Sequence, residues 1–329
     1  MSHSEIDAVR ELLRSRPRPT GFAERRERLD AIGWASPLAT DIRLEATDAN
    51  GVAAEWSLAS GSDPSRVLLF FHGGGYCSGS IVSHRGMVTE VGRSAGMRTL
   101  AVAYRLAPEH PFPAALEDAR AAYSFLLDHG IAAPKIAVGG DSAGGGLTLA
   151  LMTSLRDAGE PLPGCAWLVS PWVDLQMTGA SLAEKVNVDP LISKPYLEEL
   201  ASAYLAGSDP ANPLVSPVNA DLAGLPPLLV QVGSAETLLD DAVRIARRAG
   251  AADVRVNLEI WPHMIHAWHL WAAQLEEGRR AIASAGAFIT RAIVNSVSAR
   301  LRFPEFARSA NSRACAHVAA PWCRAGREG

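Results

Sequence analysis

The sequence lacks the long apolar runs and the excess of basic residues that mark two large classes of protein. No uncharged apolar stretch reaches the roughly 18 residues that a membrane-spanning helix needs. The chain has 31 Lys and Arg against 35 Asp and Glu, so its formal net charge is −4. A chain without a basic surface is poorly suited to bind nucleic acid or anionic membranes. We therefore predict no nucleic-acid partner and no stable membrane anchoring.

Cysteine is also scarce, and the four cysteines are not spaced as metal ligands. They are scattered at Cys77, Cys165, Cys315 and Cys323, without the paired spacings of a zinc site. The opening residues, 1–7, are polar and acidic, which does not suit a secretory signal. We expect a reduced, cytoplasmic protein that uses no metal or other cofactor.

From residue 66 onward, short apolar segments alternate with helical patterns. The expected strands are 67–71, 99–104, 135–139, 165–169, 228–232 and 254–261, and the expected helices are 114–128, 147–157, 240–249 and 270–298. Two further strands, 41–46 and 51–58, should form a hairpin across Asn50 and Gly51. Continuous apolar strands separated by helices predict an α/β fold, with a mostly parallel sheet covered by helices on both faces.

Two segments do not follow this alternation. The first, residues 1–45, carries helical patterns at 4–15 and 23–32. The second, residues 174–219, carries one at 195–205. Ligands of open α/β sheets bind beyond the carboxyl ends of the strands, where both segments could form a lid. The predicted division is a helical cap from 1–45 and 174–219, a core from 46–173 and 220–298, and a disordered or non-native tail at 299–329.

The motif with the clearest chemistry is Gly140-Asp141-Ser142-Ala143-Gly144, which lies between an apolar strand and an apolar helix. A serine hydroxyl is a poor nucleophile unless it is held in place and its proton is removed. The flanking Gly140 and Gly144 allow a tight strand-to-helix turn that exposes Ser142. The start of the helix then presents free N–H groups beside the hydroxyl. The motif predicts a nucleophilic serine.

A second glycine-rich segment, His72-Gly73-Gly74-Gly75, directly follows the strand 67–71. Successive glycines let backbone N–H groups converge on a developing oxyanion, although such a loop can also simply link a strand to a helix. The expected donors are the N–H groups of Gly73 and Gly74, together with that of Ala143. We expect His72 to shape this loop by hydrogen bonding rather than to act as a base, and Gly75 to support it.

The base should be one of three histidines that follow the last predicted strand, His263, His266 and His269. Their spacing could suggest a metal site, but no carboxylate lies between them as in the His-Glu-x-x-His pattern. We assign the base to His266 and expect His263 and His269 to lie on the surface.

The acid that orients this base should follow the preceding strand, 228–232. Glu236, Asp240 and Asp241 are candidates, and Glu236 is nearest to the end of the strand. Asp240 and Asp241 also suit the first turn of the next helix, where carboxylates are favoured by the helix dipole. The chain order of Ser142, Glu236 and His266 is serine, acid, histidine, as an α/β-hydrolase requires. Asp240 is the second choice.

These motifs, with the string from Tyr104 to Ala115, resemble the hormone-sensitive-lipase-like esterases, the bacterial family IV group of the α/β-hydrolase superfamily. The likeness runs along about residues 1–295. It implies an α/β-hydrolase fold with a helical cap, the nucleophile Ser142, the base His266, and oxyanion donors at Gly73, Gly74 and Ala143. Two departures are Glu236-Thr237-Leu238, where the family usually has Asp-Pro-Leu, and His266-Ala267-Trp268, where it usually has His-Gly-Phe.

The resemblance also implies an activity. It points to a serine carboxylesterase that hydrolyses short- to medium-chain esters through an acyl-serine, with a small-molecule ester as its partner and a homodimer as a possible assembly. An amide deacylase or a lipase for longer chains would use the same residues. A non-catalytic ligand receptor on the same fold, as in the plant gibberellin receptors, is a remote alternative, because such proteins typically lose the histidine.

Overall fold

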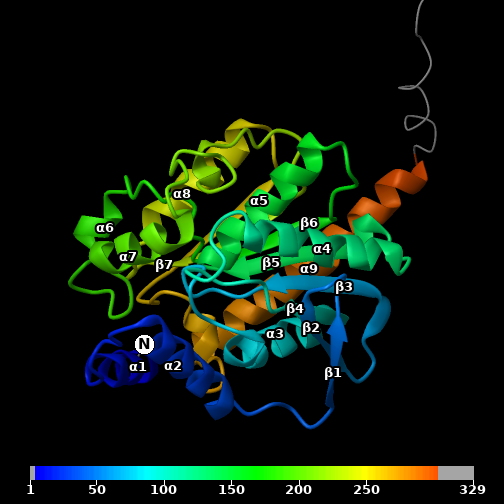
Figure 1. The fold of residues 1–329 in the computed structure, drawn as a ribbon. Coiled ribbons are helices and arrows are strands. Elements are labelled where there is room, and N and C mark those ends of the chain that lie inside the picture. The colour runs from blue at the N-terminus through cyan, green and yellow to red at the C-terminus, as the bar shows by residue number, and fades with distance from the viewer. Residues whose placement is uncertain (1–3, 303–329) are drawn as a thin grey trace, which may run out of the picture.

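The computed structural model describes residues 4–302, and side chains up to residue 294. Eight strands form one sheet in the order β1-β2-β4-β3-β5-β6-β7-β8 (Figure 1). The strands are β1 (Ile42–Asp48), β2 (Ala53–Ala59), β3 (Asp63–Phe71), β4 (Met97–Val102), β5 (Ile136–Asp141), β6 (Cys165–Val169), β7 (Leu228–Gly233) and β8 (Val256–Trp261). Pairing is antiparallel from β1 to β4 and parallel from there to β8. The predicted mostly parallel α/β fold is confirmed.

Side chains of each central strand alternate between two hydrophobic layers. In β3, Leu69 and Phe71 belong to a cluster on one face of the sheet, whereas Leu68 and Phe70 belong to a cluster on the other. The first cluster includes residues of α4 (Ala114–Asp128), α5 (Ala143–Asp157) and α8 (Leu239–Ala251). The second includes residues of α3 (Ile81–Ala95) and α9 (Glu276–Arg302). Because both faces are covered, the strands read as continuous apolar runs.

Helix α3 is absent from the predicted elements, which pass directly from the strand at 67–71 to the strand at 99–104. Gly86, Gly92 and buried polar residues interrupt its apolar pattern and hide the helical period. Gly92 is needed for packing, because a Cβ there would lie 2.4 Å from the Thr99 side chain. The start of the helix is defined by Ser80, whose side chain accepts a hydrogen bond from the Ser83 N–H.

Four helices from the two segments outside the alternation gather at one end of the molecule (Figure 1). They are α1 (Ser4–Arg14), α2 (Phe22–Ala35), α6 (Ser181–Glu184) and α7 (Lys194–Leu205). A hydrogen-bonded ion pair between Arg25 and Glu199 joins α2 to α7. The limits of the proposed cap and core stay a prediction, and most of the predicted tail, 299–329, lies outside the described residues. Within residues 4–302, no helix combines the length and the apolar composition of a membrane span.

Candidate active site

Ser142 lies on the sharp turn between β5 and α5 that its motif predicts. Its backbone has φ of 54° and ψ of −120°, which is an unusual conformation for a residue with a side chain. Two hydrogen bonds to neighbouring segments hold it there: the Ser142 N–H donates to Val169 O (2.8 Å), and the Trp172 N–H donates to Ser142 O (2.9 Å). Gly144 permits the turn, because a Cβ at that position would lie 1.9 Å from Phe71 O.

Glu236 and His266 form a buried pair. Glu236 follows β7 and His266 follows β8, and the His266 Nδ1 lies 2.8 Å from Glu236 Oε2. The other carboxylate oxygen of Glu236 accepts hydrogen bonds from the Ser170 hydroxyl (2.9 Å) and from the Gly233 N–H. Ser170 Oγ in turn accepts from the Ala267 N–H at 3.1 Å, so the acid and the histidine loop share one anchor. The structure thus brings Glu236 to the predicted base.

The electrostatics of this pair favour a charged imidazole more than an isolated ring would. Burial opposes the charged form of His266, but the hydrogen bond and the negative charge of Glu236 outweigh burial and raise its pKa above the ordinary 6.5. A neutral His266 at higher pH keeps its proton on Nδ1, facing Glu236, which leaves Nε2 as the basic nitrogen.

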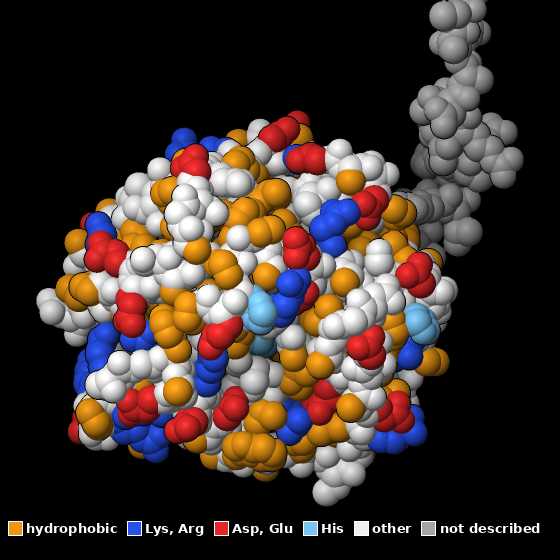
Figure 2. Space-filling model, viewed as in Figure 1, with side chains coloured by type: hydrophobic (Ala, Val, Ile, Leu, Met, Phe, Trp, Pro, Cys, Tyr) orange, Lys and Arg blue, Asp and Glu red, His pale blue; other side chains and the backbone are white. Residues whose placement is uncertain are grey.

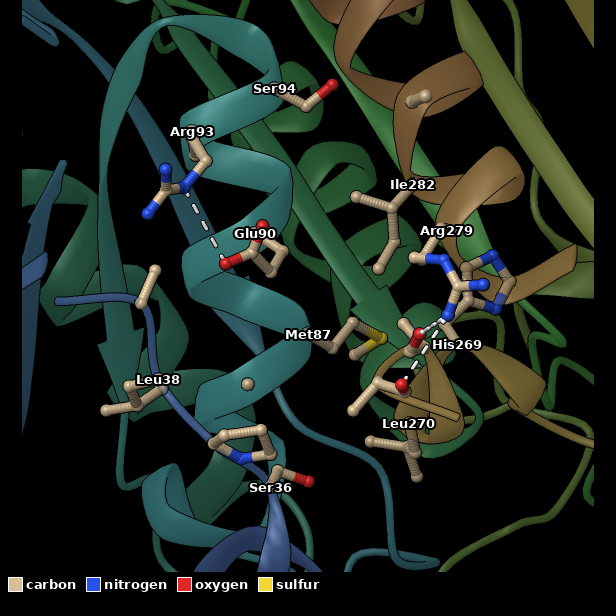
Figure 3. Close-up of a pocket in the computed structure, with 16 residues that line it drawn as sticks. Ser36, Leu38, Met87, Glu90, Arg93, Ser94, His269, Leu270, Arg279 and Ile282 are labelled. Atoms are coloured by element: carbon tan, nitrogen blue, oxygen red, sulfur yellow. Dashed lines mark hydrogen bonds and ion pairs between the residues drawn. The ribbon is translucent and has the colours of Figure 1, made fainter. Parts of the chain in front are cut away.

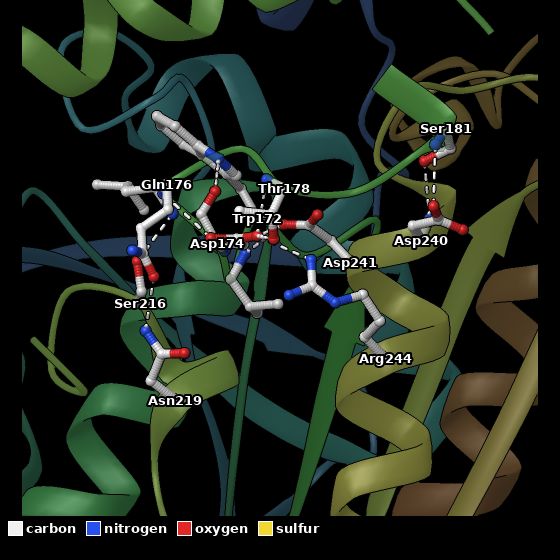
Figure 4. A network of polar contacts seen from close by, with 12 residues as sticks. Trp172, Asp174, Gln176, Thr178, Ser181, Ser216, Asn219, Asp240, Asp241 and Arg244 are labelled. Carbon is white, nitrogen blue, oxygen red and sulfur yellow. Dashed lines mark hydrogen bonds and ion pairs between the residues drawn. The ribbon is translucent and has the colours of Figure 1, made fainter. Parts of the chain in front are cut away.

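The two competing carboxylates, Asp240 and Asp241, are hydrogen bonded to a neighbouring loop (Figure 4). Asp240 Oδ2 accepts a hydrogen bond from the Ser181 N–H at 2.9 Å. Asp241 Oδ2 accepts from the N–H groups of Val173 (2.9 Å) and Asp174 (3.1 Å). Burial raises the pKa of Asp241 to about 7. Both acids cap segments around 173–181, and neither is placed to orient the base.

Ser142 and His266 line the same cavity, which has a volume of about 110 Å³. We call it the inner cavity. Apolar residues from the segments predicted to form a lid supply part of its wall: Leu29 and Ile32 of α2, and Leu191, Ile192, Tyr196, Leu197 and Leu200 around α7. The rest comes from Gly74, Gly75, His84, Asp141, Ala267, Leu270 and Trp271. Segments far apart in the sequence therefore enclose the serine.

The predicted role of Gly73 as an oxyanion donor is wrong. Its N–H donates to Asp141 Oδ1 at 2.8 Å and is therefore committed within the protein. The next two residues, Gly74 and Gly75, line the inner cavity instead. Gly74 has φ of +113°, and a Cβ there would lie 2.2 Å from Ser78 O, so only glycine fits this path.

His72 has the structural position that the sequence predicts. Its Nδ1 donates to Gly73 O at 2.9 Å, and its ring stacks on Tyr104 with 4.3 Å between the centroids. The Tyr104 hydroxyl donates to His72 O at 2.6 Å. Burial lowers the pKa of His72 to about 4, so the ring is neutral and holds the glycine loop in place.

Sequence reasoning missed His84, because it lies on the unpredicted helix α3. Its Nε2 donates to Asp141 Oδ2 at 3.1 Å, while Asp141 Oδ1 accepts from Gly73. One carboxylate, next to Ser142 in sequence, therefore joins the serine turn, the glycine loop and α3. A helix predicted at 81–95 would have placed a buried histidine near this motif.

The other two histidines near His266 differ from each other. His263 is exposed, as predicted, but His269 is fully buried, which corrects the expectation of a surface residue. His269 Nε2 donates to Gln231 Oε1 at 2.9 Å, and burial lowers the pKa of this histidine to about 3. It lines a cavity of about 520 Å³ between α3 and α9 (Figure 3). In the described part of the chain, no three His, Cys, Asp or Glu residues gather as a possible metal site.

The fold and the site define the class of protein. Serine, acid and histidine follow β5, β7 and β8 of one mostly parallel sheet, in the chain order that characterises α/β-hydrolases. The family model described as alpha/beta hydrolase fold matches residues 68–270. The chain belongs to this family.

Similarity to known proteins identifies the group within this family to which the chain belongs. An acetyl-hydrolase from Streptomyces hygroscopicus is 48% identical over 239 residues, which are 73% of this chain and 80% of that protein. An esterase from Acinetobacter venetianus is 35% identical over 80% of this chain and 86% of its own. The crystal structure of an esterase from the bacterial hormone-sensitive lipase family has a TM-score of 0.87 and 46% identity, and the match covers 89% of this chain and 99% of that one. The chain belongs to the hormone-sensitive-lipase family of esterases and is a carboxylic ester hydrolase.

Proposed function

We propose that this protein is a serine carboxylesterase that hydrolyses short- to medium-chain carboxylic esters through an acyl-serine. One observation carries the proposal: His266 is hydrogen bonded to buried Glu236 and lines the same cavity as Ser142. A small-molecule ester is the expected partner, with its carbonyl carbon beside Ser142 in the inner cavity.

His266 acts first as a base and then as an acid. Its Nε2 takes the proton of Ser142 as the serine Oγ forms a bond to the ester carbonyl carbon. Glu236 fixes the proton on Nδ1 and stabilises the imidazolium that results. The imidazolium then gives its proton to the departing alcohol as the carbon–oxygen bond breaks. Water repeats the sequence on the acyl-serine and releases the carboxylic acid.

The oxyanion formed in each half-reaction is bound by backbone N–H groups. Gly74 and Gly75 line the inner cavity, and Ala143 is the first residue of α5, where an N–H has no acceptor within the helix. We therefore assign the donors to Gly74, Gly75 and Ala143. Loss of one such donor typically costs about 2.7–4 kcal/mol of transition-state stabilisation.

The size of the inner cavity supports short acyl groups. A volume of about 110 Å³, closed by apolar side chains of α2 and α7, suits a small acyl chain better than a long one. A series of p-nitrophenyl esters with a matched anilide tests this choice. We expect the highest kcat/KM on acetate, butyrate or hexanoate. A maximum on palmitate would favour the lipase alternative, and faster cleavage of the anilide would favour the deacylase.

Replacement of the nucleophile tests the mechanism itself. Ser142→Ala should lower kcat on p-nitrophenyl butyrate by about 10⁶, because serine, histidine and acid act as a unit. A fluorophosphonate should label the native protein and not the variant, and a matched Ser208→Ala variant should label normally. Loss of only a few-fold in kcat would contradict the assignment of Ser142 as the nucleophile. No labelling of the native protein would favour a passive ligand receptor.

A further inference from the structure

A second cavity adjoins the inner one and is unusually rich in arginine. We call it the outer cavity. It has a volume of about 410 Å³ and lies between the segment 13–32 and the segment 190–199. The two cavities share four lining residues, Leu29, Ile32, Leu191 and Tyr196. The outer cavity is therefore placed as an entrance to the candidate active site.

The charged side chains that line the outer cavity are mostly of one sign. The lining contains Arg16, Arg18, Arg25 and Arg28 but only one carboxylate, that of Glu199. Figure 2 shows Lys and Arg side chains, with Asp and Glu side chains among them, at the end of the molecule where α1 and α2 lie. An anion that enters between these helices meets a positive potential, strengthened by the low dielectric of the surrounding protein.

Arg25 is the most informative of the four. It is only 7% exposed, and its Nη2 donates to Glu199 Oε2 at 2.5 Å. Its Nε and Nη1 are buried and have no hydrogen-bond partner among the described residues. The rings of Phe22 and Tyr196 lie 5.3 Å and 5.0 Å from its guanidinium carbon and hold it in place. A buried guanidinium with free donors is prepared for an acceptor that the protein itself does not supply.

Two of the arginines nearer the surface also carry a positive charge that no carboxylate of the described residues neutralises. Arg28 is paired with Glu24, but Arg16 and Arg18 have no carboxylate partner within residues 4–302. Arg18 donates to the neutral Ser193 hydroxyl at 3.1 Å. This bond positions the guanidinium at the cavity without neutralising it.

We propose that the outer cavity is an anion subsite, and that the preferred substrates are esters carrying a carboxylate or phosphate group away from the scissile bond. The anion binds Arg25 and Arg18 in the outer cavity, and the ester group reaches Ser142 through the shared neck. The inference rests on the proposed esterase function and specifies its substrate class. The charged group is part of either the acyl chain or the alcohol.

Two pairs of substrates distinguish the two positions of the charge. In the first pair, mono-(4-nitrophenyl) adipate is compared with 4-nitrophenyl hexanoate, so the acyl chain carries the anion. In the second pair, 4-acetoxybenzoate is compared with its methyl ester, so the leaving alcohol carries it. For each substrate the readout is kcat/KM of a variant relative to the native protein, which cancels differences in intrinsic reactivity.

Two variants test the arginines, and one serves as a control. Arg18→Gln and Arg25→Gln should each lower kcat/KM by about tenfold or more on the anionic member of one pair, because hydrogen bonds between charged groups contribute strongly to binding. The neutral member should change by less than about twofold. Arg43→Gln, on β1 with a 69% exposed side chain, should change neither. Arg25→Lys should retain part of the anion preference, because it keeps the charge.

The outcomes separate this inference from the esterase proposal. If the native protein hydrolyses the neutral esters in a Ser142-dependent way, the esterase function stands. Equal losses on anionic and neutral substrates in Arg18→Gln would then overturn the anion subsite alone. Arg18 is on the surface, so a folding defect of Arg25→Gln leaves the test intact.

Discussion

At the scale of single residues, the pair formed by Glu236 and His266 makes the pH dependence of hydrolysis predictable. A general base must be neutral, and the hydrogen bond to Glu236 raises the pKa of His266 above 6.5. Activity should therefore fall as the pH drops through a value above 6.5, since protonated imidazole cannot accept the serine proton. The measurement is kcat/KM on p-nitrophenyl butyrate across the pH range. Full activity below pH 6 would contradict this assignment.

Two carboxyl-to-amide changes at neighbouring positions show which acid acts on the histidine. Glu236→Gln removes the charge that raises the pKa of His266, so burial should prevail and move the acid limb of the profile to lower pH, at a much reduced maximal rate. Asp240→Asn should leave the limb in place, because Asp240 bonds to the Ser181 N–H. The reverse pattern would assign the acid to Asp240.

Some features of the site could be predicted from the sequence, and others depend on contacts between residues that are distant in sequence. Ser142, Glu236 and His266 could be assigned from sequence, since each follows a recognisable strand. The error at Gly73 arose because the direction of its N–H depends on Asp141, which is distant in sequence. The burial of His269 depends on its hydrogen bond to Gln231, which no local pattern reveals.

At the scale of secondary structure, the stability of α3 should depend on Ser80, the residue that caps its N-terminus. The Ser80 side chain accepts from the Ser83 N–H at 3.1 Å and also donates to Asp30 of α2. Ser80→Ala should destabilise the protein by about 0.5–2 kcal/mol, as the loss of an N-terminal cap commonly does. Urea unfolding measures this change. Ser94→Ala, on an exposed side chain of the same helix, should have little effect, and equal losses would argue against the cap.

The strands could be predicted because both their faces are covered, which makes them continuous apolar segments. Helix α3 could not be predicted, since Gly86 and Gly92 lie where it packs closely against neighbouring segments. A Cβ at Gly86 would lie 3.1 Å from the Ser36 side chain. Tertiary contacts, rather than helix propensity, therefore account for those residues.

At the scale of the whole molecule, the layer formed by α3 and α9 should carry much of the stability. Ile289 of α9 is fully buried in the cluster that includes Leu68 and Phe70. Ile289→Ala should cost about 2–5 kcal/mol in free energy of unfolding, through lost burial and the cavity left behind. Val294→Ala on the same helix, where the side chain is 52% exposed, should change stability by less than about 0.5 kcal/mol. Similar values for both variants would show that α9 contributes little to the core.

Much of the apolar wall of the inner cavity comes from α2, α7 and the residues just before α7, whereas the serine, acid and histidine follow strands of the sheet. Substrate choice and bond-breaking chemistry are thus encoded in separate stretches of the gene. Mutations in the two helical stretches can redirect the enzyme toward new esters without loss of its reactivity. Directed evolution of this protein should accordingly find altered selectivity most readily at residues 16–32 and 190–200.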